Sequence, residues 1–168
     1  SLLNERGELG PHVSFFEGLA RQIAPPGWRP ALAWAHVQAG RPDVARRLIE
    51  EMSAGDFATT PRDSNFVARI AQVAHAVIEL GDADLAARVE PLLAPLSEFW
   101  VVLGPSACTL GPIAYCDGAL RHLLDRPAEA AESFELAIER ARAMRARPYE
   151  ARAQAGISEG LLRLSFRQ

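Results

Sequence analysis

The side chains of this chain that could bind a metal are two cysteines and a nearby histidine. Cys108, Cys116 and His122 lie within one short stretch, and thiolate and imidazole groups are common zinc ligands. The sequence contains neither a Cys-x-x-Cys pair nor a His-Glu-x-x-His motif. Because buried cysteine usually behaves as a small apolar residue, we interpret both cysteines as core residues and predict no metal site.

Motifs for catalysis are also missing from the sequence. It has no Walker-type glycine loop and no Gly-x-Ser-x-Gly nucleophile turn. His36 and His75 lie in apolar helical segments, where a structural histidine is expected rather than a ligand or a pH switch. We therefore predict that the chain is not an enzyme and holds no cofactor.

One basic cluster stands out in a chain that contains 18 basic residues and no lysine. The cluster consists of Arg140, Arg142, Arg145, Arg147 and Arg152. Arginine in the last turns of a helix is favoured by the helix dipole, and neighbouring Glu135 and Glu139 can neutralise part of the charge. The net charge of −3 and pI near 5.8 also argue against nucleic acid or an anionic membrane as partners.

The compartment is predicted from what the sequence lacks. It has no apolar run of about 18 residues that could span a bilayer and no start resembling a signal peptide. Two cysteines are too few for a disulfide framework, so we expect a cytoplasmic protein. Residues 1–168 are expected to form a single domain, excised from a longer protein because the chain opens at Ser1 just before a turn at Gly7.

A short turn recurs along the chain and gives the first indication of architecture. Its four occurrences are Gly7-Glu-Leu-Gly10, Gly40-Arg-Pro-Asp43, Gly81-Asp-Ala-Asp84 and Asp125-Arg-Pro-Ala128. The intervals of 33, 41 and 44 residues are those expected of stacked helical hairpins. The fold class predicted from this repeat is all-α.

Apolar residues at helical spacing predict the elements between these turns. Helices are expected from Pro11 to a stop at Pro25-Pro26-Gly27, and then over 31–39, 44–52, 65–80, 85–93, 113–124, 127–146 and 149–166. A polar loop is expected over 53–64. The apolar stretch 97–112 is too rich in glycine and proline for a helix, so we expect an irregular connection there.

The hairpins resemble the tetratricopeptide repeat, a helix-turn-helix unit with small residues where its two helices cross. The strongest match is the third hairpin, with Gly118, Asp125, Ala130, Phe134 and Ala137 at the small, turn, small, aromatic and small positions. The first hairpin matches at Ala33, Gly40 and Ala45, and the second at Ala74, Gly81 and Ala86. Departures include Ile49 and Glu90 in place of the aromatic. The resemblance implies a tetratricopeptide-like α-solenoid of stacked hairpins.

The stretch from Trp28 to Arg152 also resembles the helical C-terminal region of large bacterial signalling proteins. Those proteins join an ATPase module to such repeats, often with a nucleotide cyclase or a LuxR-type DNA-binding domain. This resemblance implies a regulatory segment of a bacterial signalling or transcription-regulating protein.

In tetratricopeptide arrays the first helix of each hairpin lines a concave face, and this resemblance implies the partner-binding residues. They are Trp34, Val37, Gln38, His75, Glu79, Tyr115, Ala119 and His122. A mixed aromatic and polar row suits a peptide, another protein or another domain of the parent protein. A second copy of the chain is a further candidate partner. An alternative for Trp34 and Tyr115 is that they fill gaps between adjacent helices.

The loop over 99–112 has two interpretations. It could fold into the groove as a plug, since an exposed Phe99-Trp100-Val101-Val102 run would promote aggregation. Alternatively it closes over a small molecule, which would make the chain a small-molecule-sensing domain. We favour the plug, and with it a non-enzymatic interaction domain as the function.

Overall fold

The computed structural model describes residues 12–22, 25–55, 57, 60, 62–103 and 108–165. These residues are mostly helical, so the predicted all-α character is confirmed. The helices are α2 (Val13–Gln22), α3 (Pro25–Gln38), α4 (Pro42–Ser53), α5 (Phe66–Leu80), α6 (Ala83–Leu93), α7 (Ile113–Leu123), α8 (Pro127–Ala143) and α9 (Arg147–Ser165). A 3₁₀ turn, η2 (Ala94–Leu96), and two strands, β1 (Trp100–Leu103) and β2 (Cys108–Pro112), lie between α6 and α7.

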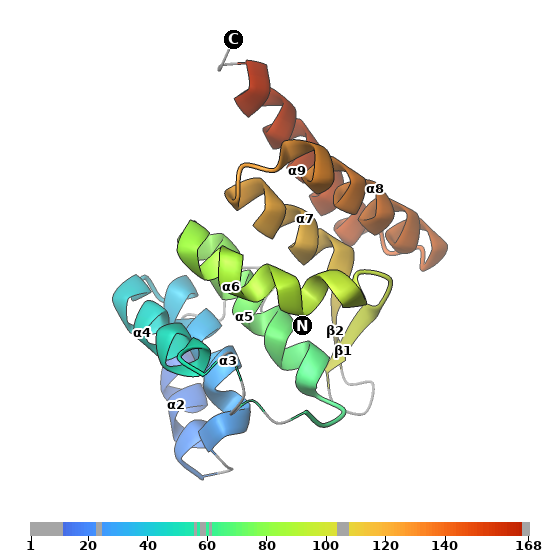
Figure 1. The fold of residues 1–168 in the computed structure, drawn as a ribbon. Coiled ribbons are helices and arrows are strands. Elements are labelled where there is room, and N and C mark those ends of the chain that lie inside the picture. The colour runs from blue at the N-terminus through green and yellow to red at the C-terminus, as the bar shows by residue number, and fades with distance from the viewer. Residues whose placement is uncertain are drawn as a thin grey trace.

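Helices that follow one another in the chain pack side by side. Helix α3 contacts both α4 and α5, α5 contacts α6 and α7, α7 contacts α8, and α8 contacts α9. Figure 1 shows this progression from α2–α4 at one end, through α5 and α6, to α7–α9 at the other. Helices α3, α5 and α7, each the first of a helical pair, are therefore neighbours in the middle of the molecule.

The recurring turns have a common backbone conformation. Gly40, Gly81 and Asp125 all have φ between 59° and 70°, the left-handed conformation that commonly ends a helix. The amide after the left-handed residue donates to a carbonyl five residues back: Arg41 to His36, Asp82 to Val77, Arg126 to Arg121 and, after Arg145, Ala146 to Ala141. Three predicted turns are thus confirmed, and the turn at Gly7 lies outside the described residues.

The largest difference between the predicted and observed helix boundaries is at α3. We predicted that Pro25-Pro26-Gly27 stops a helix and that the next begins near residue 31, but α3 begins at Pro25. Proline is tolerated in the first turn because the amide groups there have no partner within the helix. Helices α4 and α8 begin with proline in the same way, at Pro42 and Pro127.

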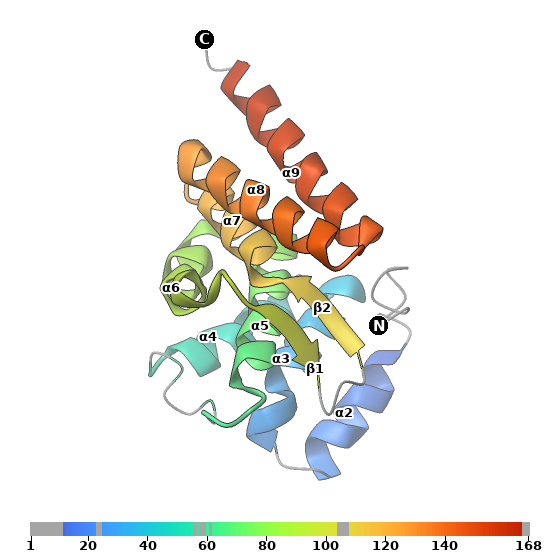
Figure 2. The same cartoon turned by 90° about the vertical axis from the view of Figure 1, so that its right-hand side faces the viewer.

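The stretch 97–112 is not the irregular connection that we expected. Strands β1 and β2 pair antiparallel, with Val101 opposite Gly111 and Val102 opposite Thr109, so Leu110 is an extra residue that bulges from β2. Gly111 has φ of 92°, which favours glycine. The β-branched and aromatic run of β1 favours an extended strand. In Figure 2 this hairpin lies across α5, on the face that also includes α3.

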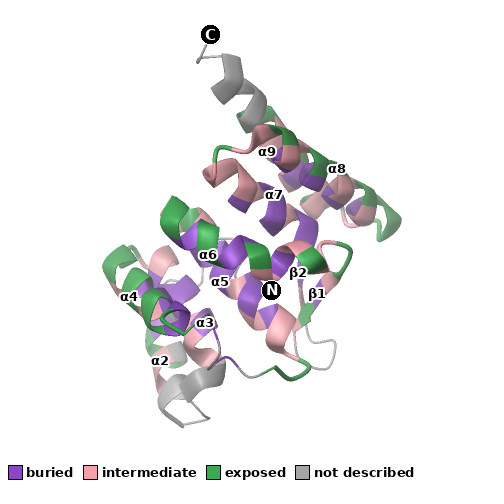
Figure 3. Cartoon of the chain, viewed as in Figure 1, coloured by how far each residue is buried: buried purple, intermediate pink, exposed green. Residues whose placement is uncertain are grey.

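The core has one large cluster and a smaller one. The large cluster is centred on α5, where Ile70, Val73 and Val77 are fully buried. Figure 3 shows the buried residues concentrated on α5 and α7, with the outer faces of α4 and α8 exposed. The smaller cluster gathers around Phe134 and joins α7, α8 and α9.

Phe134 explains why two helices carry glycine where they cross α8. A Cβ atom built on Gly118 would lie 2.9 Å from the Phe134 ring and 3.1 Å from the Ala130 carbonyl oxygen. One built on Gly156 would lie 2.6 Å from the same ring. Both distances are too short for real carbon atoms, so the aromatic side chain needs glycine on both flanking helices.

Candidate functional site

A row of aromatic side chains crosses the first helices of the three pairs. Trp34 of α3 stacks on His75 of α5, with ring centroids 4.6 Å apart and planes inclined by 9°. His75 in turn lies 6.2 Å from the Tyr115 ring of α7, and Tyr115 lies 6.0 Å from Phe134 of α8. These separations are typical of interacting aromatic pairs.

The sequence positions these side chains through the turns. Trp34 and His75 each lie six residues before the glycine that ends their helix, and Gln38 and Glu79 each lie two residues before it. The corresponding position in α7 is Ala119, and Tyr115 lies one turn earlier on the same face. Equivalent positions in successive hairpins are thereby brought together.

Glu79 is an exposed polar residue beside this row. Its Oε1 atom accepts a 2.6 Å hydrogen bond from Trp34 Nε1 and a 3.3 Å bond from Gln38 Nε2. Trp34 itself is only 4% exposed, so its ring is fixed by packing and its N–H direction is fixed with it. A surface carboxylate is therefore held in one orientation by two donors on the neighbouring helix.

His75, in the middle of the row, is buried and electrically neutral. Burial, with Arg152 nearby, lowers the pKa of His75 to about 3 despite a hydrogen bond with the Leu110 backbone. Its Nε2 atom lies 3.6 Å from the Cys116 sulfur, and burial raises the pKa of that thiol to about 12. A reactive cysteine needs the opposite shifts, toward thiolate and imidazolium. This pair therefore offers no activated nucleophile at neutral pH.

The other predicted residues are distributed along the same face. Val37 packs against the large core cluster and is half-buried. Tyr115 is also half-buried, and burial raises its pKa to about 12. His122, two turns beyond Tyr115 on α7, is half-buried near the end of that helix. The structure thus brings together Trp34, Gln38, His75, Glu79 and Tyr115.

The β-hairpin covers part of this face. Val101 and Leu110 are buried in the large core cluster, whereas Phe99 is 58% exposed. On the side of α9, Tyr149 donates a 3.0 Å hydrogen bond to the Thr109 carbonyl. Its ring lies directly against Gly111 and leaves no space there for a side chain. The hairpin consequently connects the α5 core with α9.

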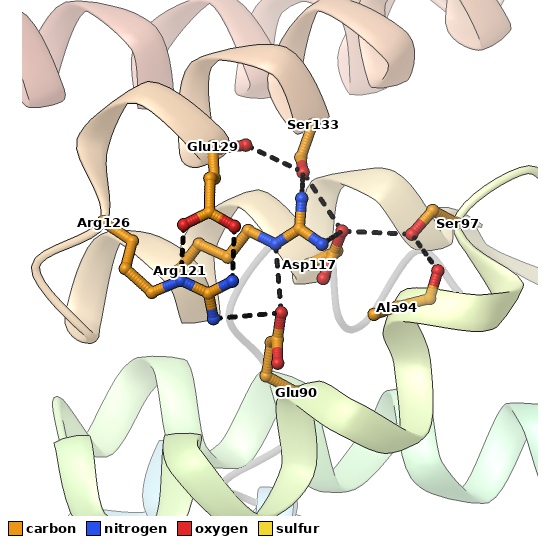
Figure 4. Close-up of polar contacts among 8 residues, drawn as sticks. All are labelled: Glu90, Ala94, Ser97, Asp117, Arg121, Arg126, Glu129 and Ser133. Atoms are coloured by element: carbon orange, nitrogen blue, oxygen red, sulfur yellow. Dashed lines mark hydrogen bonds and ion pairs between the residues drawn. The ribbon is translucent and has the colours of Figure 1, made fainter.

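A buried polar network that sequence reasoning largely missed lies between α6, α7 and α8 (Figure 4). Asp117 is 1% exposed, and its Oδ2 atom lies 3.0 Å from the hydroxyls of Ser97 and Ser133 and 3.2 Å from Arg121. Arg121 also donates a 3.0 Å bond to Glu90, which is nearly buried on α6. Only the Asp117–Arg121 pair has the local i,i+4 spacing, and the other partners are distant in sequence.

Desolvation is the main influence on the pKa of Asp117. Burial raises the pKa of this carboxyl group, while Arg121 and the Ser97 and Ser133 hydroxyls oppose the change. Its second oxygen, Oδ1, is buried and has no hydrogen-bond partner among the described residues. The network fixes α6 relative to α7 and α8. Asp117 depends on Arg121 for charge compensation, and Glu90 pairs with both Arg121 and Arg126.

The basic cluster divides into side chains with different roles. Arg140 pairs with Glu98, Arg142 pairs with Glu150, and the Arg152 guanidinium lies over the rings of Tyr115 and Tyr149. These arginines therefore serve contacts within the molecule, in agreement with a structural interpretation of the cluster.

Neither a metal centre nor a membrane-spanning helix is found in the described part of the chain. No group of three or more potential His, Cys, Asp or Glu ligands is placed to hold a metal ion there. None of the described helices is long and apolar enough to cross a bilayer. Cys108 belongs to β2, but its side chain lies outside the described residues.

Comparisons with protein-family models, with curated proteins and with solved structures find no match to this chain. The functional interpretation therefore depends on the geometry of the site.

Proposed function

We propose that the chain is a tetratricopeptide-like α-solenoid that acts as a non-enzymatic interaction and regulatory domain. In this proposal it belongs to a bacterial signalling or transcription-regulating protein of the cytoplasm. Its partner is a peptide, another protein or another domain of the parent protein. It uses neither a cofactor nor a metal.

The repeated turn geometry supports the solenoid. Three helix pairs share a left-handed residue at the same place, and consecutive helices remain neighbours in space. The close crossings of α7, α8 and α9 at Gly118 and Gly156 are of the kind that the tetratricopeptide pattern requires. Stacked arrays of this type usually bind partners on the surface that their first helices form.

The observation that carries the functional proposal is the row from Trp34 through His75 to Tyr115, with Gln38 and Glu79 beside it. The face over these three helices is rigid, because Trp34 and His75 are buried beneath it, and it is polar at its edge, where Glu79 is exposed. Such a surface suits an extended partner. The neutral His75–Cys116 pair supports a role in binding rather than in catalysis.

Site-specific photo-crosslinking tests this proposal. Gln38, which lies beside Glu79, is replaced by benzoylphenylalanine in the full parent protein so that Glu79 and its Trp34 bond remain, and exposed Glu135 on α8 is replaced in a matched control. Irradiation in the native cell should join position 38 to a defined protein or to another domain of the parent chain, identified by mass spectrometry. The control should give no such product, and identical patterns at the two positions would contradict the proposal.

The alternative is a small-molecule sensor in which the hairpin is a lid. The burial of Val101 and Leu110 and the contacts of Tyr149 with β2 favour a plug instead, because lifting the hairpin would expose core residues. Native mass spectrometry before and after mild denaturation separates the two. A stoichiometric small molecule that is lost on denaturation would favour the sensor.

A further inference from the structure

Glu79 has the geometry of a preorganised hydrogen-bond acceptor. Both donors from α3 bind Oε1, so Oε2 has no partner among the described residues although the side chain is exposed. Trp34 Nε1 is held at 2.6 Å by a ring that cannot move without disturbing its stack on His75. The carboxylate therefore presents one free oxygen in a fixed direction, and a ligand would not have to order it.

The immediate surroundings of Glu79 leave its charge uncompensated. Gln38 and Trp34 are neutral donors, and His75, one turn earlier on α5, is also neutral because burial lowers its pKa to about 3. No ion pair joins Glu79 to a basic side chain among the described residues, and the Arg152 guanidinium lies over the rings of Tyr115 and Tyr149. The exposed feature of this part of the face is thus the Glu79 carboxylate, fixed over the buried rings of Trp34 and His75.

We propose that the face binds a basic segment of its partner, with a lysine or arginine side chain donating to Glu79 Oε2. This inference rests on the proposed function and specifies the chemistry of the partner at the same face. A charge-assisted hydrogen bond to a fixed carboxylate is stronger than one between neutral groups. An acidic segment or a nucleic-acid phosphate would be repelled by the same oxygen.

Fluorescence anisotropy with two labelled probes tests the inference. The basic probe is a heptapeptide of alternating glycine and arginine, and the acidic probe carries glutamate in place of arginine. The chain should bind the basic probe, and added salt should weaken binding. Glu79→Gln, which keeps an acceptor oxygen for Trp34, should weaken it roughly tenfold. Glu135→Gln removes an exposed carboxylate elsewhere and should leave it unchanged.

The outcomes separate this inference from the proposed function. Equal weakening by Glu79→Gln and Glu135→Gln, or tighter binding of the acidic probe, would overturn the basic-segment proposal. A partner crosslinked at position 38 through an acidic segment would also overturn it while the interaction function stands. If binding of the basic probe requires Glu79 but crosslinking captures no partner, the proposed interaction function is contradicted, whereas the proposed binding chemistry of Glu79 stands. Melting curves of both variants verify that each is folded.

Discussion

At the scale of single residues, Phe134 determines which side chains its neighbours can carry. Gly118→Ala places a methyl group 2.9 Å from the Phe134 ring and 3.1 Å from a backbone oxygen that cannot rotate away. We expect a loss of about 1–3 kcal/mol in the free energy of unfolding, as for overpacked cores. Urea denaturation followed by circular dichroism measures the loss.

The same substitution at another helical glycine provides the control. A Cβ built on Gly18 of α2 meets nothing within 4 Å, so Gly18→Ala should stabilise the protein by roughly 0.5–1 kcal/mol through helix propensity. The two variants should therefore shift the denaturation midpoint in opposite directions. A stabilising effect of Gly118→Ala would show that the helices can separate at this crossing.

At the scale of elements, the Thr109 side chain holds the β-hairpin together at its bulge. Its hydroxyl donates to the Val101 carbonyl and accepts from the Gly111 amide and from Trp100 Nε1. Thr109→Val keeps the shape and leaves these groups without their partner, so we expect a loss of about 1–3 kcal/mol. Hydrogen exchange should become faster in 100–103 and 108–112.

Val102, which lies opposite Thr109 on β1, provides a control in which valine is replaced by threonine. Val102 is 45% exposed, and Val102→Thr should alter stability by less than about 0.5 kcal/mol. If Thr109→Val also leaves the free energy of unfolding unchanged, water replaces the hydroxyl, and the hairpin does not depend on the Thr109 side chain.

The polar network makes a second prediction at this scale. Arg121→Met leaves Asp117 and Glu90 buried without their shared cation, and we expect a loss of roughly 3–5 kcal/mol. Arg126→Met also removes a cation near Glu90, but Arg126 is more exposed, so the loss should be clearly smaller than for Arg121→Met.

A double-mutant cycle identifies the origin of that loss. Adding Asp117→Asn to Arg121→Met removes one of the two stranded charges, and the double variant should be more stable than the sum of the single effects predicts. Simple additivity in thermal or urea unfolding would mean that the charges are solvated and do not act together.

At the scale of the whole molecule, the sequence predicted the helices and turns, which depend on local periodicity. Glycine and aspartate at the turns and apolar residues at helical spacing were sufficient for the helices around Gly40, Gly81 and Asp125. The hairpin was missed because the stretch is rich in glycine and proline, and one contact that holds it comes from Tyr149, about 40 residues further along the chain. Glu79 was predicted from its position, but its fixed orientation depends on Trp34 of another helix.

The acid stability of the whole molecule should depend on His75. Burial lowers the pKa of His75 to about 3, whereas in the unfolded chain the pKa returns to about 6.5. Between these values the unfolded state binds a proton that the folded state does not. His75 therefore contributes stability above pH 6.5 that is lost as the pH falls, by roughly 1.4 kcal/mol per pH unit.

His75→Phe removes the titrating group while keeping a ring against Trp34, so the free energy of unfolding should fall less steeply between pH 6.5 and 4 than in the native chain. The raised pKa of Asp117 acts in the opposite direction, because its protonation stabilises the folded state as the pH falls. That contribution is common to both proteins and cancels in the difference. Parallel curves for native and His75→Phe proteins would mean that His75 reaches solvent and is protonated without unfolding.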